Sequence, residues 1–162
     1  MNKKGRNFEK SLVEERLKFL ELDLPRVSKP LHCYSPIIIH NKIAYISGQV
    51  PRINGTLPYH GKVGEEVSID EARHCAELCV LKALSYLKQE LKNLDSVEQI
   101  LQVTGYVQSA SNFSQQSIVI DATSELLENI YGEIGQHSRT AVGVNELPSN
   151  SPVEISFVIA VK

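Results

Sequence analysis

The pattern of apolar and polar residues predicts strands in five places. β-branched and aromatic residues gather in short runs that Pro, Asn, Asp and Ser interrupt, which is typical of strands. These runs cover residues 37–39, 43–47, 97–108, 137–144 and 152–161. The pair Asn41-Lys42 is expected to turn the first run into the second as a hairpin. The polar segment from Asn145 to Ser151 is expected to join the last two runs as a second hairpin.

A 3.6-residue period predicts three helices. The shortest covers Ser11 to Leu22 and ends before a proline. The longest starts at Ser68, where Ser68 and Glu71 form a capping box, and runs for about six turns. The third extends roughly from Ser114 to Tyr131 and is stopped by Gly132. Their apolar stripes consist of Val13, Leu17 and Leu20; of Ala72, Cys75, Ala76, Cys79, Ala83, Leu84, Leu87 and Leu91; and of Val119, Ala122, Leu126 and Ile130.

Alternation along the last two strands indicates that both faces of the sheet are covered. One face of the final strand carries Val153, Ile155, Phe157, Ile159 and Val161, and the other carries Glu154, Ser156, Val158 and Ala160. Helices are expected on one face only. The opposite face is expected to carry further apolar residues, namely Ala44, Ile46, Ala141, Val158 and Ala160. We therefore predict a two-layer α+β domain with a mixed sheet whose second face packs against other copies of the chain.

Composition narrows the class of protein. The 162 residues suit one domain, and 17 basic against 19 acidic residues give a net charge of −2, which argues against nucleic-acid binding. No run is long enough to span a membrane, and no secretory leader is evident. Three cysteines favour a reducing compartment, so a cytoplasmic location is expected. Cys75 and Cys79 lack further soft ligands, so we predict core cysteines and no metal site.

Two charged residues in apolar strands are candidates for chemistry. Arg139 can bind a carboxylate through two parallel hydrogen bonds, and Glu154 can hold and deprotonate a water molecule. The alternative is an ordinary ion pair or a pair of solvated strand ends. Tyr34 is a candidate either for packing or for a binding site. The glycine-rich loop from Ile53 to Val67 contains no phosphate-binding pattern and is a candidate cover for a pocket.

Two motifs resemble the RidA (YjgF-like, reactive-intermediate deaminase) family. The pattern S-R-T-A-V-G-V-x-x-L-P-x-x-x-x-V-E-I, residues 138–155, resembles its C-terminal signature, and residues 45–51 resemble its central S-G-Q-x-P strand. The resemblance covers roughly residues 30–161. It divides the chain into an N-terminal extension with a short helix, 1–29, and a RidA-like domain, 30–162. It also implies the chorismate-mutase-like fold and a homotrimer with sites between subunits.

The resemblance further implies an activity without cofactor or metal. RidA-like deaminases hydrolyse 2-imino acids, or their enamine tautomers, to 2-keto acids and ammonia. By position, Arg139 would bind the substrate carboxylate, while Glu154 and the backbone carbonyl of Gly48 would orient the attacking water. Tyr34 and Ser47 would line the pocket.

Some positions depart from the family pattern. Ala141, in the substrate-binding region, replaces a common Cys, and Asp121 stands where Asn is expected. The N-terminal helix and the 53–67 loop indicate a longer paralogue branch. A non-catalytic trimeric module that binds small carboxylates or a protein partner is therefore the alternative function. Ribonuclease activity, which an older family label suggests, is disfavoured by the acidic charge balance.

Overall fold

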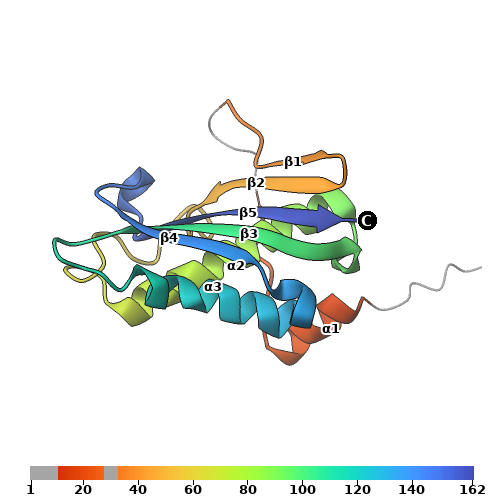
Figure 1. The fold of residues 1–162 in the computed structure, drawn as a ribbon, viewed down its shortest axis with the longest axis horizontal. Coiled ribbons are helices and arrows are strands. Elements are labelled where there is room, and N and C mark those ends of the chain that lie inside the picture. The colour runs from red at the N-terminus through yellow and green to blue at the C-terminus, as the bar shows by residue number, and fades with distance from the viewer. Residues whose placement is uncertain (1–10, 28–32) are drawn as a thin grey trace, which may run out of the picture.

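A computed structural model describes residues 11–27 and 33–162, which form a layer of helices against one face of a five-stranded sheet (Figure 1). The strands are β1 (Ile37–His40), β2 (Ile43–Gln49), β3 (Val97–Gln108), β4 (Ser138–Val144) and β5 (Val153–Val161). The helices are α1 (Leu12–Phe19), α2 (Ile69–Leu91) and α3 (Gln116–Tyr131), with short 3₁₀ turns η1 (Leu94–Ser96), η2 (Gly132–Gly135) and η3 (Pro148–Asn150). The predicted two-layer α+β class is confirmed.

Local signals place the helix and hairpin boundaries close to their predicted positions. The Ser68 hydroxyl accepts the Glu71 amide at 3.2 Å, and the Glu71 carboxylate accepts the Ser68 amide at 2.8 Å, which completes the capping box of α2. Gly132 ends α3 with a φ of 67°. Asn41 and Lys42 both have positive φ and connect β1 to β2 in the tight turn expected of a hairpin.

The predicted hairpin between the last two strands is wrong. The order of the sheet is β1-β2-β5-β3-β4, so β3 lies between β4 and β5. β4 pairs with β3 in parallel, and β5 pairs with β3 and β2 in antiparallel orientation. A strand, a helix and a second strand in succession form a crossover unit, which brings β4 back alongside β3 in parallel. β4 therefore occupies an edge of the sheet.

The assignment of residues to the two faces of the sheet is only partly as predicted. Burial alternates along β5, where the odd residues are buried and the even ones half-buried, as the period-2 pattern predicts. Ala44, Ile46 and Ala141 were expected on the face away from the helices, but all three lie on the helix-covered side. Ala44 and Ile46 pair with Ile159 and Phe157, and Ala141 packs against the core. Both faces of β2 are apolar, so its pattern does not tell which face is covered.

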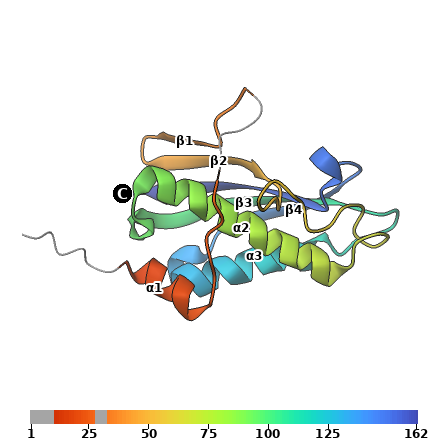
Figure 2. The same ribbon diagram turned by 180° about the vertical axis from the view of Figure 1, so that it is seen from behind.

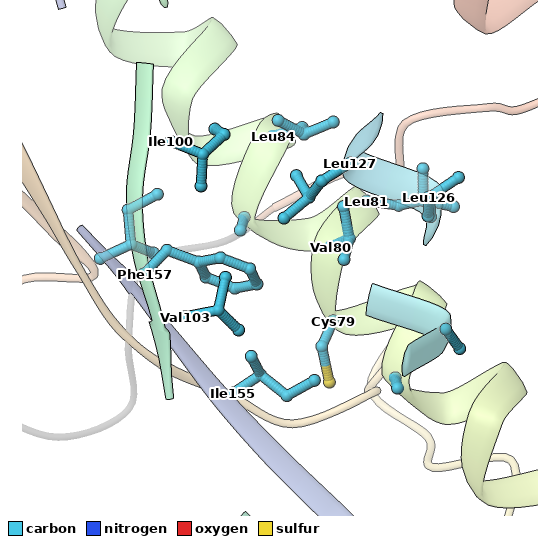
Figure 3. Packing of buried hydrophobic residues seen from close by; sticks show 14 of the residues in the cluster. Cys79, Val80, Leu81, Leu84, Ile100, Val103, Leu126, Leu127, Ile155 and Phe157 are labelled. Atoms are coloured by element: carbon cyan, nitrogen blue, oxygen red, sulfur yellow. The ribbon is translucent and has the colours of Figure 1, made fainter. Parts of the chain in front are cut away.

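The core lies between the sheet and helices α2 and α3. Phe157 and Ile155 of β5 and Val103 of β3 point toward Cys79 and Leu84 of α2 (Figure 3). Cys75 and Cys79 have no solvent exposure and are free thiols, as predicted for core cysteines. Burial raises the pKa of Cys75 to about 12 and that of Cys79 well above its ordinary value, so neither is poised to ionise.

The N-terminal helix extends the helix layer. α1 packs against α3 and η1. The Asp95 carboxylate accepts the amides of Leu12 and Val13, each at 3.0 Å, and so caps the first turn of α1. Arg16 donates to the carbonyl of Ile130 at 3.1 Å. The chain then runs from α1 across the outer side of α2 toward β1 (Figure 2).

Among the helices described, none combines the length and the apolar character that crossing a membrane would require.

Candidate functional site

The carboxylate of Glu154 lies directly above the backbone of Gly48. A Cβ atom added to Gly48 would stand 1.9 Å from Oε1 of Glu154, which no real pair of atoms tolerates. The absence of a side chain at residue 48 therefore allows the carboxylate to reach the backbone of β2. A register shift in the pairing of β2 with β5, between Ile46 and Gln49, falls at the same place.

The residues before β1 are fixed to the same end of β2. The Ser47 hydroxyl donates to the carbonyl of Ser35 at 2.8 Å, and the Ser47 amide donates to the carbonyl of Pro36 at 3.0 Å. Tyr34, the next residue back along the chain, is 53% exposed and lies near Tyr86 of α2, whose pKa is raised by burial and by Tyr34. We call Ser47, Gly48 and Glu154 the Glu154 half-site.

Glu154 is set apart from an ordinary surface carboxylate by its surroundings. It is half-buried on β5, opposite Tyr106 of β3. Burial raises the pKa of Glu154 above the ordinary value of 4.5. A carboxylate whose pKa is raised is a stronger base than a solvated one.

Arg139 is held by α3 through a chain of hydrogen bonds. Nη1 of Arg139 lies 2.7 Å from Oδ1 of Asp121 and donates to the Ser124 hydroxyl at 3.0 Å. Ser124 lies 3.0 Å from Nε2 of His137, and Nδ1 of His137 lies 2.7 Å from the carbonyl of Gly135. A carbonyl only accepts, so Nδ1 carries the proton when the ring is neutral and Nε2 accepts from Ser124. We call Arg139, Asp121, Ser124 and His137 the Arg139 half-site.

The two half-sites are separated within one chain. Arg139 pairs with Val103, a core residue, and so points toward the helices. Glu154 pairs with Tyr106 and points to the other face. Ala141 shares the helix-covered face with Arg139, as their spacing predicts. The structure thus gathers Ser47, Gly48 and Glu154 but leaves Arg139 and Ala141 elsewhere.

The loop from Ile53 to Val67 is fixed to the ends of the strands. Its amides at Gly61 and Val63 donate to the carbonyls of Asn150, at 2.9 Å, and Gln108, at 2.7 Å. Leu57, Val63 and Val67 of the loop are themselves buried. Arg52, just before the loop, donates to the Ser149 hydroxyl at 2.6 Å. This packing gives the loop a structural role at the β3–β4 end of the sheet.

Sequence reasoning missed Ser124 and His137 and did not pair Asp121 with Arg139. Asp121 and Ser124 are three residues apart on α3 and therefore share a helix face. That spacing was the available signal, but only the parallel placement of β4 beside β3 brings Arg139 to this face. In the part of the chain that the structure describes, no three His, Cys, Asp or Glu side chains are arranged to hold a metal ion.

Comparison with known proteins places the chain in a family. Residues 14–160 match the family model described as "YjgF/chorismate_mutase-like, putative endoribonuclease". The crystal structure of an Agrobacterium tumefaciens protein of unknown function is 34% identical, with a TM-score of 0.85 over 93% of this chain and 92% of that one. The structure of a "putative endoribonuclease" from Shewanella oneidensis is 30% identical, with a TM-score of 0.88 over 92% and 99% of the two chains.

A curated relative is similar over nearly the same length. Protein TCP17 of Trypanosoma cruzi is 29% identical over 150 residues, which are 91% of this chain and 92% of that protein. The resemblance inferred from residues 45–51 and 138–155 and the chorismate-mutase-like fold are both confirmed. The chain belongs to the YjgF/chorismate mutase-like family.

Proposed function

We propose that the protein hydrolyses reactive 2-imino acids, or their enamine tautomers, to 2-keto acids and ammonia. The observation that carries the proposal is the close approach of the Glu154 carboxylate to the backbone of Gly48. It places a half-buried base beside the half-buried backbone of Gly48, where a water molecule can bind between the carboxylate and the Gly48 carbonyl. The raised pKa of Glu154 supports the same role.

The reaction then needs little more than positioning. Glu154 takes a proton from the bound water as its oxygen adds to the imine carbon, and the π electrons of the C=N bond move to nitrogen. The nitrogen takes up this proton, which gives a neutral amino alcohol. Glu154 then removes the hydroxyl proton as the C=O bond forms and the C–N bond breaks, and it passes this proton to the departing ammonia. The oxygen of water becomes the keto oxygen, so no oxidant, metal or cofactor enters the balance.

The substrate carboxylate is assigned to Arg139 of a neighbouring subunit. Both contacts of Arg139 with α3 use Nη1, and neither Nε nor Nη2 makes a hydrogen bond to the described residues. The sheet face away from the helices exposes Ile38, Tyr45, Tyr106 and Val142 by 36–58%. Burying this face in a homotrimer removes apolar surface from water. Because β4 is an edge strand, Arg139 lies at the rim of the sheet, where the Glu154 half-site of a neighbouring chain can approach it.

The test is hydrolysis of an imino acid that an amino-acid oxidase generates in the same solution. We expect the wild type to accelerate loss of the imine, and we expect Arg139→Ala and Glu154→Gln each to abolish the acceleration while the proteins remain folded. Glu128→Gln, on the exposed side of α3, is the matched control and retains full activity. If the wild-type protein accelerates the hydrolysis of no imino acid, small or bulky, the proposal is wrong.

The positions that depart from the family pattern, Asp121 and Ala141, support the alternative of a non-catalytic binding module. Arg139-dependent binding of small carboxylates without any imine hydrolysis is the result that would identify this module. We make no ribonuclease proposal, because the net charge of −2 gives no electrostatic surface for RNA. The three free cysteines support placement in the reducing cytoplasm.

A further inference from the structure

Asp121 places a negatively charged carboxylate beside the positively charged guanidinium in the Arg139 half-site. The side chain of Asp121 is 44% exposed and that of Arg139 is 24% exposed, so the pair is open to solvent. Only Oδ1 of Asp121 contacts Arg139, at 2.7 Å, and Oδ2 makes no hydrogen bond to the residues that the structure describes. A ligand at this half-site therefore meets donors on Arg139 and a free acceptor beside them.

We infer that Asp121 determines specificity at this half-site and selects ligands in which a protonated nitrogen lies next to a carboxylate. The inference rests on the proposed function, because it takes Arg139 to be the carboxylate-binding residue. The carboxylate would bind Nε and Nη2 of Arg139, and the neighbouring N–H⁺ group would donate to Oδ2 of Asp121. The ligand class is the zwitterionic 2-iminium acid, whose charges oppose those of the Arg139–Asp121 pair.

The charge balance explains the selection. A lone Arg favours any carboxylate, including the 2-keto acid that remains after deamination. Beside Asp121, a ligand with only a negative charge is repelled by a like charge at short range. A zwitterion instead gains a charge-assisted hydrogen bond to Asp121, which should raise its affinity roughly tenfold or more. Asp121 thus favours binding of the protonated substrate and release of the anionic product.

Protonation is also what the reaction needs. An iminium carbon is more electrophilic than the carbon of a neutral imine, because its nitrogen carries the positive charge that the incoming electron pair neutralises. By accepting a hydrogen bond from the N–H group of the iminium, Asp121 holds the reactive form in place without itself exchanging a proton. Ser124 accepts from the same Nη1 as Asp121 and is itself held by His137, so the guanidinium is tied to α3 at one nitrogen.

The experiment compares two stable ligands of equal length, the zwitterion norvaline and the anion 2-oxopentanoate, by titration calorimetry. We expect the wild type to bind norvaline more tightly than the keto acid, and both affinities to be lost in Arg139→Ala. Asp121→Asn keeps an acceptor for Nη1 but removes the charge. It should shift the ratio of the two dissociation constants toward the keto acid by roughly tenfold or more. Glu128→Gln removes the same charge elsewhere on α3 and should leave the ratio unchanged.

The outcomes separate this inference from the proposed function. A ratio that is the same in Asp121→Asn and Glu128→Gln overturns the inference, even if imine hydrolysis still requires Arg139 and Glu154. A ratio that shifts only in Asp121→Asn supports the inference, even if no imine is hydrolysed. Ligand binding that is absent, or that persists in Arg139→Ala, overturns the inference because the site would then be elsewhere.

Discussion

Arg139 and Glu154 lie on opposite faces of one sheet, two strands apart. The residue on β5 that lies level with Arg139 across β3 is Phe157, three residues from Glu154. With strands about 4.8 Å apart and about 3.3 Å per residue, the two Cα atoms are separated by roughly 14 Å. A ligand the size of a small imino acid therefore cannot reach both side chains of one chain, and a site that uses both must combine two chains.

Mixed oligomers test this arrangement directly. Arg139→Ala and Glu154→Gln protein, each inactive alone, should regain activity when they are unfolded together and refolded as a mixture. Random assembly of a trimer gives both intact residues at roughly a quarter of the interfaces, so roughly a quarter of wild-type activity is expected. The measurement is imine hydrolysis before and after mixing. A mixture that stays inactive although mass spectrometry shows mixed trimers contradicts a site shared between chains.

Gly48→Ala should abolish activity at little cost in stability. The new methyl group would stand 1.9 Å from Oε1 of Glu154 and must displace the carboxylate, which is the flexible end of its side chain. We expect kcat to fall at least tenfold while the melting temperature changes by only a few degrees. In a Glu154→Ala background, where no carboxylate has to be displaced, the same substitution should leave the melting temperature unchanged. An equal change in melting temperature in both backgrounds would show that the new methyl group does not act on Glu154.

Glu154→Gln should stabilise the folded protein at neutral pH. Burial raises the pKa of Glu154 above 4.5, so the folded state binds its proton more tightly than the unfolded state does. The free energy of unfolding therefore falls as pH rises through the window between 4.5 and the raised pKa. Thermal unfolding at pH 7 should show a higher Tm for the variant, and below pH 4 the difference should vanish. A variant that is less stable at pH 7 would mean that the ionised carboxylate is favourably paired.

Activity should follow the same ionisation in the opposite sense. Because the base must be deprotonated, kcat/KM of the wild type should decline as pH falls through the raised pKa of Glu154, starting above the pH at which a solvated carboxyl group protonates. A pH–rate profile between pH 4 and 8 checks this, with the coupled oxidase in excess. A profile that remains flat down to pH 4.5 would exclude Glu154 as the base.

Asp95→Ala should loosen α1 without affecting the reaction. Its carboxylate accepts two amides from the first turn of α1, at residues 12 and 13, and loss of such a cap costs about 1–2 kcal/mol. Hydrogen exchange of the α1 amides should accelerate, while exchange in α2 stays slow. Asp70→Ala, in the exposed first turn of α2, is the control for removal of an acidic residue. Unchanged protection of α1 would show that packing of Val13 and Leu17 alone holds the helix.

The sequence by itself determined the features that depend on residues close together along the chain, namely the ends of helices, a tight turn and the buried sides of elements. The capping box of Ser68 and Glu71, the stop at Gly132 and the turn at Asn41-Lys42 depend on hydrogen bonds and backbone angles within a few residues. The 3.6-residue and 2-residue periods identified the buried sides of α2, α3 and β5 for the same reason. The motifs at residues 45–51 and 138–155 were contiguous, so the family could also be inferred.

Only the tertiary structure decided which segments lie next to each other. Insertion of β3 between β4 and β5 depends on the path of α3 across the sheet, which no local pattern records. The side chains of Ala44 and Ile46 are buried because the helices cover that side of β2, and a strand that is apolar on both sides does not reveal which side this is. The same crossover brings Arg139 to Asp121, eighteen positions away, and leaves Glu154 on the other face. Contacts between residues so far apart in the sequence depend on how the whole core packs, so the neighbours of Arg139 and Glu154 are known only from the folded structure.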